Sequence, residues 1–511
     1  MTPLIPFQLS FRQELPEVVG NVDYHIFRDL LERIEEILKL GHLDVEIVKH
    51  LIQESENHKI KESEKTGNPV KALSKKEIQH IRRIANEALR CSVARSLMGE
   101  AYRVFSAHLA DSVLLQKFCM LDNWGGPIKV PSKSTLQRYE QLVPEAVIRQ
   151  IITRLNTQSS QLPRPAGSQR LELATPVNMD DYYADLTVIK TNIHFPVDWV
   201  LLTDAIRTLL KSIIWIRKSG IKNRMQPPEE LLKTINRYAM QMTHTRRRKE
   251  SKKERKRILR ILKKMTVTIK NHACKHRDLL ENNWKTTDLK EGHVKHVISR
   301  INRILKQLPQ AIHQAHERII GKRAVKSQDK LLSLYEPDTN VIVRGKAGAE
   351  VEFGNTLFLG EQRDGLILDW RLYKDKAPSD NVTLIESLDR MKKTFDGYQP
   401  KQATGDRGLF SKKNGNLLEK RGIENNLCPR DVTQLQKKLQ NEDFAGHQLR
   451  RGQTEGRIGI MKNCFLGTPF RNKGFVSREQ GLSWKVLSHN LWVLARLPRA
   501  GSEETQLPLA A

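Results

Sequence analysis

The sequence contains no long run of apolar residues. The longest apolar stretches, such as Trp199–Leu202 and Ile213–Ile216, are far shorter than the roughly 20 residues that a membrane-spanning helix needs. The N-terminal segment MTPLIPFQLSFRQEL has no basic start followed by an apolar core, so we expect no secretory signal. These absences predict a protein that neither crosses nor is anchored in a membrane.

Cysteine is scarce and scattered along the chain. None of the five cysteines belongs to a CxxC pair; they are Cys91, Cys119, Cys274, Cys428 and Cys464. Their odd number and wide spacing argue against a disulfide framework and against a zinc site. We therefore expect five small buried side chains in a protein of a reducing cytoplasm.

Acidic residues are few relative to basic ones. The chain of 511 residues has 87 Lys and Arg against 58 Asp and Glu, which gives a net charge of +29 and a pI of about 9.9. Such a surplus requires a polyanionic partner or a very salty solvent. Nucleic acid is favoured over an anionic membrane surface, because each neutralised phosphate releases condensed counterions. The length suggests about three domains, and the composition is that of a folded protein.

Residues 1–155 show the apolar spacing of helices, which predicts an all-helical N-terminal region. Trp124–Pro127 interrupts the pattern, and the segment PSKSTLQRYEQL follows at residues 131–142. Ser132 or Ser134 would cap a short helix there. That helix would carry Lys133, Gln137 and Arg138. A turn followed by a short basic helix is what a helix-turn-helix presents to the major groove. We predict that this region binds DNA; an ordinary capped surface helix is the alternative.

Residues 156–179, rich in Ser, Gln, Pro and Gly, predict a linker, and Tyr182–Lys190 is typical of a strand. Residues 199–335 have long, very basic helical patterns, which predict an all-α insert in the form of a helical hairpin or coiled-coil arm. Val297–Leu308 carries its clearest apolar stripe. The most basic run, RRRKESKKERKRILR, begins with Arg246, Arg247 and Arg248. Such a run is either a solvated face or a face that tracks DNA, and the global charge favours DNA.

From Tyr335 the apolar period changes to two, as in β-strands. We expect strands at Asn340–Arg344, Glu350–Leu359, Leu366–Tyr373, Gln402–Thr404 and Glu424–Cys428, and helices at Val382–Thr394, Ser411–Arg421, Leu449–Asn463 and Gln480–Leu497. This order predicts an α/β domain over residues 180–500, with a mixed sheet, helices on its faces and the basic all-α insert within it. Residues 501–511 are expected to form a flexible tail.

Three acidic residues stand where phosphodiester chemistry would need them. That chemistry uses two Mg²⁺ ions about 3.5–4 Å apart, and Mg²⁺ prefers carboxylate oxygens. Asp185 lies in a predicted strand and Glu455 in a predicted helix. Asp406 follows a strand, where Gly405 and Gly408 would let a metal and a DNA backbone come close.

The residues around these carboxylates add one pattern and one ambiguity. Arg451 and Lys462 are spaced by 4 and 7 from the helix position of Glu455, so the three share one helix face. A carboxylate between two cations suits a place where metal and phosphate are both held. Asp181 shares a sheet face with Asp185, because side chains in a strand alternate with a period of two. The residues alone leave the choice between these two open.

These segments resemble the DDE-type transposases of bacterial insertion sequences. The stretch Asn192–Pro196 (NIHFP) after Asp185 is especially similar, and Asp406–Phe410 (DRGLF) resembles the family's Asp-x-Gly-aromatic pattern with the aromatic one place late. Arg451, Glu455 and Lys462 match the spacing of its Tyr-x₂-Arg-x₃-Glu-x₆-Lys signature, with Gln448 in the Tyr position. Further similar segments are Arg344–Lys346, Val351–Gly354 and Ser488–Leu491. The resemblance covers residues 180–500, apart from the basic insert, and loosely 100–140.

The resemblance implies an RNase H-like fold for the catalytic domain. It implies that Asp185, Asp406 and Glu455 ligate two Mg²⁺ ions, with Mn²⁺ as a substitute. Arg451 and Lys462 would hold phosphates near the cut, and Lys346 would contact DNA. His489 and Asn490 are expected to pack or cap a helix. The enzyme would hydrolyse the transposon ends and transfer the 3′-OH to target DNA.

The partner would then be double-stranded DNA, bound by a homodimer in a bacterial cytoplasm, on the nucleoid. Two alternatives remain open. One is a catalytically inactive DNA-binding protein derived from a transposase. The other is an RNase H-like nuclease without strand transfer.

Overall fold

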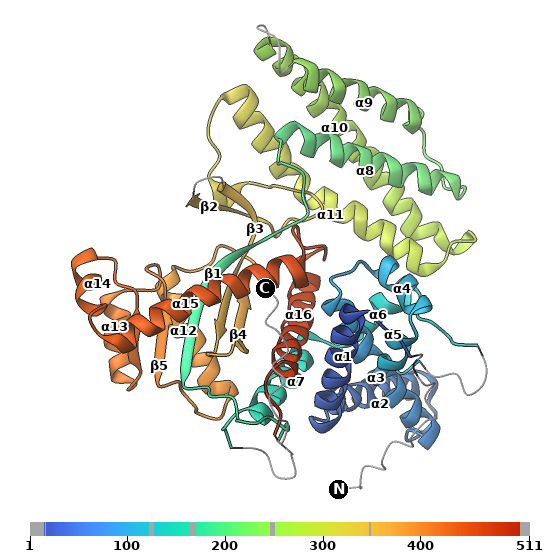
Figure 1. Ribbon diagram of the computed structural model, residues 1–511. Helices are drawn as coiled ribbons and strands as arrows, with labels where there is room; N and C mark the ends of the chain where they lie inside the picture. Colours follow the sequence, from blue (N-terminus) through green and yellow to red (C-terminus); the bar gives the residue numbers. More distant parts are fainter. Residues whose placement is uncertain are drawn as a thin grey trace. The chain divides into compact units, whose positions relative to one another are not determined.

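The computed structural model describes residues 15, 17–121, 127–163, 170–245, 251–346 and 349–500. The chain forms two compact units. The first comprises Met1–Ile189, Thr356–Tyr373 and Ala377–Ala511, and the second Lys190–Asn355 and Lys374–Lys376. Figure 1 shows helices and strands in both. The expected mixture of helix and strand is confirmed, and no described helix is long and apolar enough to cross a membrane.

The N-terminal part of the first unit is helical, as predicted. Its helices are α1 (Val22–Leu40), α2 (Val45–Thr66), α3 (Lys75–Leu97), α4 (Tyr102–Asp111), α5 (Val113–Phe118), α6 (Lys133–Leu142) and α7 (Glu145–Ser159). Helix α3 begins with a reciprocal capping box between Ser74 and Glu77, which satisfies two backbone N–H groups. Residues of these helices belong to the same hydrophobic core as the strands. The N-terminal region is therefore not a separate domain.

One long C-terminal helix explains this shared core. Helix α16 (Phe475–Ala495) packs against α1, α3, α6 and α7 and also against β4. It is buried nearly all round, and Trp484 is fully buried within it. A helix with apolar contacts on every side belongs inside a core rather than on a surface.

The sheet is mixed. Its strands are β1 (Asp181–Lys190), β2 (Asn340–Lys346), β3 (Ala349–Glu361), β4 (Ile367–Leu372), β5 (Gln402–Gly405) and β6 (Glu424–Leu427). The order is β2-β3-β1-β5-β6, with β4 also paired to β3. Strands β3 and β4 are antiparallel, as are β2 and β3. Strands β1, β5 and β6 run parallel, so their carboxyl ends meet at one edge.

The remaining helices of the first unit are α12 (Asp380–Thr394), α13 (Lys412–Lys420), α14 (Val432–Lys438) and α15 (Glu442–Ile460), which continues into a π-helical turn, η4 (Met461–Leu466). Helix α15 begins earlier than predicted because the Asn441 side chain caps it by accepting from Phe444 N. The short α14, capped by Asp431, was not predicted, since none of its side chains is buried and it shows no apolar period.

The second unit holds a compact bundle of four helices instead of the predicted hairpin or coiled-coil arm. They are α8 (Asp198–Lys218), α9 (Pro228–Thr245), α10 (Ser251–Asn283) and α11 (Glu291–Ala315), followed by a π-helical turn, η2 (His316–Gly321). Helix α8 contacts all three others, and the bundle has its own core. The predicted stripe on α11 is buried. The arm interpretation was wrong because a second apolar helix, α8, offers these helices a common core.

The segment predicted as a linker is partly packed. Helix α7 reaches Ser159, and Leu162, Leu171, Val177 and Met179 are buried in the core. The cysteines are all free, and Cys464 is exposed rather than buried as expected. Three predictions fall wholly or largely outside the described residues: the Trp124–Pro127 break, the three arginines Arg246, Arg247 and Arg248, and the tail 501–511.

Candidate active site

The two predicted aspartates lie on neighbouring parallel strands. Ala184 of β1 pairs with Gly405 of β5. Asp185 and Asp406 directly follow these two paired residues, so they lie side by side. Neighbouring strands lie about 4.8 Å apart. Asp181 pairs instead with Gln402, which places it about 13 Å along the strand from Asp185. The register thus resolves the ambiguity: Asp185, not Asp181, lies beside Asp406.

The Asp185 carboxyl group is held where its charge is unfavourable. Burial, then the nearby charge of Asp406 and that of Glu455, raise the pKa of Asp185 to about 6. The Leu186 backbone N–H, which donates to Asp185 Oδ1 at 2.7 Å, and the Arg451 charge oppose this shift. Asp185 is therefore close enough to both other predicted carboxylates to feel their charge. A buried carboxylate repelled by two neighbours is a candidate for a functional site.

Asp406 is positioned by a tight turn. Its Oδ1 accepts the backbone N–H groups of Gly408 at 3.0 Å and Leu409 at 3.2 Å. A Cβ on Gly408 would lie 2.5 Å from Asp380 Oδ2 and 3.2 Å from Asp406 Oδ1. A side chain at position 408 would therefore displace one of these two carboxylates, whereas a Cβ on Gly405 would meet Leu409 and Leu427. Asp380, at the start of α12, was not predicted, because it becomes a neighbour only through the fold.

Glu455 lies on α15, which contacts both β5 and β6. Its carboxylate is exposed and pairs with Arg451 at 2.8 Å, one helical turn earlier. Such an exposed pair contributes only about 0.3–0.5 kcal/mol. The ion pair therefore orients Glu455 without fixing it strongly, and a cation at the Asp185–Asp406 edge would compete with Arg451 for it.

Lys462 reaches the same strand by a different route. It lies in the π-helical turn after α15 and donates from Nζ to Thr187 Oγ1 of β1 at 3.2 Å. Thr187 is two residues beyond Asp185, so both point to the same face of the sheet. Lys462 therefore contacts the strand of Asp185, but the shared α-helix face predicted for Arg451, Glu455 and Lys462 does not continue to it, because the α-helix ends at Ile460.

A buried network behind the site was missed by sequence reasoning. Arg450 donates to Glu361 Oε1 at 3.0 Å and to the carbonyls of Gln362 and Arg363 at 3.0 and 2.7 Å. Thr454 Oγ1 donates to the same Glu361 oxygen at 2.8 Å. These contacts tie α15 to the end of β3. No local signal could reveal them, since the partners are far apart in sequence.

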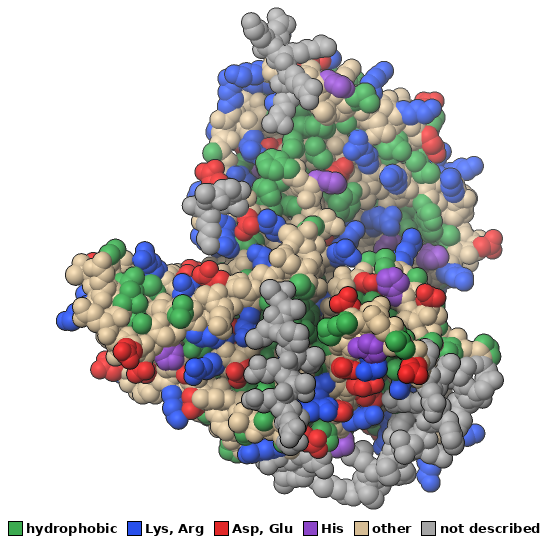
Figure 2. Space-filling model, in the orientation of Figure 1, with side chains coloured by type: hydrophobic (Ala, Val, Ile, Leu, Met, Phe, Trp, Pro, Cys, Tyr) green, Lys and Arg blue, Asp and Glu red, His purple; other side chains and the backbone are tan. Residues whose placement is uncertain are grey.

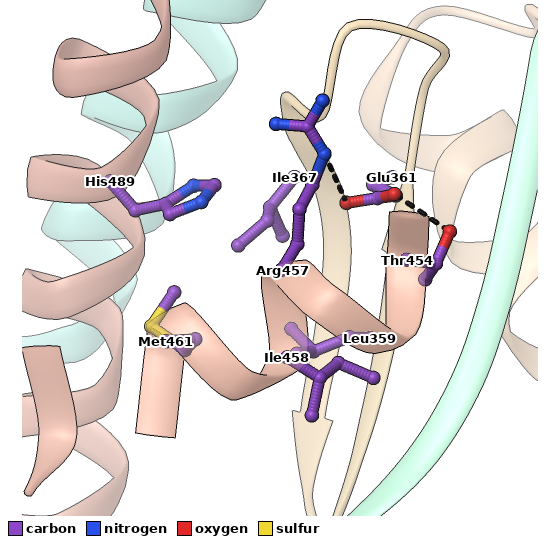
Figure 3. A pocket seen from close by; sticks show the side chains of 8 residues that line it. All are labelled: Leu359, Glu361, Ile367, Thr454, Arg457, Ile458, Met461 and His489. Carbon is purple, nitrogen blue, oxygen red and sulfur yellow. Dashed lines mark hydrogen bonds and ion pairs between the residues drawn. The ribbon is translucent and has the colours of Figure 1, made fainter. Parts of the chain in front are cut away.

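A small cavity beside this network is not a substrate site. Figure 3 shows Arg457, Glu361 and His489 around it, with Arg457 Nε 3.7 Å from Glu361 Oε2. Its volume of about 10 Å³ holds about one water molecule. Burial lowers the pKa of His489 to about 4, so its ring is neutral at neutral pH. His489 and Asn490 have the structural role predicted for them; Asn490 accepts from Ile367 N.

The donor set suits a hard cation. Asp185, Asp406 and Glu455 supply oxygen ligands of the kind that Mg²⁺ and Mn²⁺ take. In the described part of the chain, however, no three acidic, His or Cys side chains are arranged closely enough to hold one metal as they stand. Glu455 instead pairs with Arg451 at 2.8 Å.

The structure places some of the predicted DNA-contacting residues on exposed surface and does not describe the side chains of others. Ser132 caps α6 by accepting from Thr135 N, and three side chains of this helix are exposed: Lys133, Gln137 and Arg138. Lys346 is the last residue of β2, but its side chain lies outside the described part. Gln448, in the family's Tyr position, donates to Asn426 O at 2.7 Å. No protein-family model, no curated protein and no solved structure matches this chain.

Proposed function

We propose that this protein is a DDE-type transposase that cuts and joins DNA with metal ions held by Asp185, Asp406 and Glu455. One observation carries the proposal: the β1–β5 register sets Asp185 beside Asp406, at the carboxyl edge of parallel strands. In α/β proteins, ligands usually bind at the carboxyl ends of the parallel strands. Asp406 and Glu455 both raise the pKa of Asp185, which supports a common site.

The strand arrangement supports an RNase H-like catalytic domain. Strand β1 is flanked on one side by β3, which pairs with β4 in antiparallel fashion, and on the other by the parallel strands β5 and β6. Helix α15 then supplies the third carboxylate. The four-helix bundle is inserted between β1 and β2 in the sequence, which accounts for the long separation of Asp185 from Asp406.

The chain's own residues would divide the work as follows. Asp185, Asp406 and Glu455 would hold two Mg²⁺ ions, which would activate a water or a DNA 3′-OH as the nucleophile and would stabilise the leaving oxygen. Lys462 would hold a phosphate oxygen beside Thr187. Arg451, released from Glu455 when a metal binds, would pair with a second phosphate. The exposed side chains of α6 would contact the transposon end.

A cleavage and joining assay tests this function. A labelled duplex carrying the inverted repeats that flank the coding region is incubated with protein and Mg²⁺ or Mn²⁺. We expect nicking and joining that disappear in Asp406→Ala and Asp185→Asn. Asp181→Asn is the matched control, because it changes a carboxylate on the same strand face away from the site, and it should retain activity.

Two results would replace this proposal by its alternatives. Sequence-specific binding without nicking by the wild-type protein would indicate an inactive DNA-binding derivative. Nicking without joining would indicate an RNase H-like nuclease. Homodimer formation on paired ends, also expected from the family resemblance, is measured by sedimentation of the DNA complex.

A further inference from the structure

The charge surplus of the chain is concentrated in the second unit. Residues 190–355 and 374–376 contain 39 Lys and Arg but 17 Asp and Glu, a surplus of 22 out of the chain's 29. The first unit, which holds the candidate active site, accounts for the remaining 7. Figure 2 shows blue side chains spread over the visible face of the helical bundle. This concentration of positive charge indicates that the bundle itself binds an anionic partner.

Two helices of the bundle carry cations with no acidic residue between them. In α10, the segment from Arg255 to Arg277 has nine Lys and Arg and no Asp or Glu. It is about 34 Å long at 1.5 Å per residue. In α11 and its continuation, the segment from Gly292 to His316 has four Lys and Arg, four His and no acidic residue. Along the sequence, the nearest acidic residues stand just beyond the ends of these segments.

The two segments lie against each other in antiparallel fashion. Lys263 Nζ donates to His316 Nδ1 at 3.1 Å, and Arg277 donates to Asn302 Oδ1 at 2.9 Å. These contacts join the two helices over about four helical turns. Lys270, midway between Lys263 and Arg277 at a spacing of seven, lies on the same edge of α10.

Two exposed side chains of α11, Lys306 and His313, extend this edge into a basic face. We call it the seam face; its members are Lys263, Lys270, Arg277, Lys306 and His313. Arg277, at one end of the seam face, also forms a salt bridge with Asp278 at 2.7 Å. Lys263 contacts an imidazole rather than a carboxylate.

The chemistry of the seam face selects among polyanions. Helices α10 and α11 contain no Phe, Tyr or Trp, so they offer no platform on which bases of a single strand could stack. Their one large, strongly exposed apolar side chain is Val267, at 52%. Insertion into a membrane interface needs a broad apolar face. The basic edge from Lys263 to Arg277 is about 21 Å long at 1.5 Å per residue, and it instead matches the phosphate backbone over about two thirds of a turn of duplex DNA.

We propose that the seam face binds the phosphate backbone of double-stranded DNA without reading its sequence. Lysine and arginine contacts to phosphates position a protein on a duplex but carry no base information. The assignment of this duplex as transposon or target DNA rests on the proposed function. The binding itself does not, because it needs neither metal nor the carboxylates.

A salt-dependence experiment on the full chain tests the proposal. The seam variant is Lys263→Gln, Lys270→Gln, Lys306→Gln. The control variant is Lys211→Gln, Lys218→Gln, Lys233→Gln, which removes the same charge from exposed positions of α8 and α9. Both keep the buried core intact, and unchanged thermal unfolding verifies this. Affinity for a duplex of arbitrary sequence, about three helical turns long, is measured by fluorescence anisotropy over a range of salt, without divalent metal.

We expect the seam variant to lose about tenfold or more in affinity, with a salt slope smaller in magnitude by about 2 to 3, at about 0.9 for each lost phosphate contact. The control variant should retain the wild-type slope within about one. Equal losses in both variants would overturn the proposal in favour of diffuse attraction. Stronger seam-dependent binding to a single strand, or to phosphatidylserine vesicles, would also overturn it.

The test separates the two proposals. If the seam variant binds as tightly as wild type while wild type cuts and joins DNA, this inference falls and the proposed function stands. If wild type never cuts but the seam variant alone loses binding, the proposed function falls and the inference stands.

Discussion

Replacing Asp185 by asparagine is expected to stabilise the metal-free protein. Asp185 is buried beside Asp406 and within the field of Glu455, and these surroundings raise its pKa to about 6. At neutral pH the folded protein therefore holds a carboxylate at an unfavourable place. An asparagine side chain there would have nearly the same shape and could still accept the Leu186 N–H, but it carries no charge. The substitution removes the unfavourable charge and keeps the packing.

The size of the effect follows from the pKa. Its increase from 3.8 to about 6 corresponds to about 3 kcal/mol, at 1.36 kcal/mol for each pKa unit. This is an upper limit, because solvent reaches part of the side chain. We expect the free energy of unfolding of the first unit to rise by about 1–3 kcal/mol at neutral pH.

The pH dependence has a defined sign. The folded pKa of Asp185 lies above its unfolded pKa, so its favourable contribution is complete below about pH 4 and is lost as the pH rises through about 6. The difference between Asp185→Asn and wild type should therefore be small near about pH 4 and should reach its full value near about pH 7.

Urea unfolding in EDTA at several pH values measures this difference. Asp181→Asn, which removes a carboxylate 3.9 Å from Arg363, is the control and should not stabilise. Addition of Mg²⁺ should stabilise wild type, because a ligand that binds only the folded state favours it, and should have little effect on Asp185→Asn. A destabilised Asp185→Asn protein, or a difference that does not change with pH, would refute the reasoning.

Two further substitutions test the packing and the ion pair around the candidate active site. A Cβ at Gly360 would lie 1.7 Å from the hydroxyl oxygen of buried Tyr182, so Gly360→Ala should cost about 1–3 kcal/mol in urea unfolding. The control Gly446→Ala, in open space on α15, should be neutral or stabilising, and equal effects would contradict the packing argument. Arg451→Gln removes the ion pair of Glu455 and should tighten Mn²⁺ binding to the DNA-free protein in titration calorimetry while slowing cleavage. Weaker Mn²⁺ binding would show that Arg451 does not compete with the metal.

Much of the local structure could be predicted from residue patterns. The α11 stripe, the β-type period after Tyr335 and the Ser132 cap depend on neighbours within a few residues, so the sequence contains the information they need. The boundaries of α15 and the existence of α14 were predicted less well. They depend on side-chain caps and on packing that is absent from α14.

The candidate site divides in the same way. The spacing of Arg451 and Glu455, and the glycine beside Asp406, are local features, and the structure has them as expected. The contact of Lys462 with Thr187 joins residues that only the fold brings together, as does the salt bridge of Arg450 to Glu361. Such partners could not be identified from the sequence, because many other distant residues could form the same hydrogen bond or salt bridge equally well.

The sequence by itself determined the net charge, the helical and strand regions and the three candidate carboxylates, because charge and periodicity are properties of composition and local order. The tertiary structure alone decided three other points. It selected Asp185 over Asp181, made the basic insert a four-helix bundle, and aligned the cations of α10 and α11 in one seam face. Each depends on the register or packing of segments that are distant in the chain, and such contacts are set by the closure of the whole core rather than by any one segment.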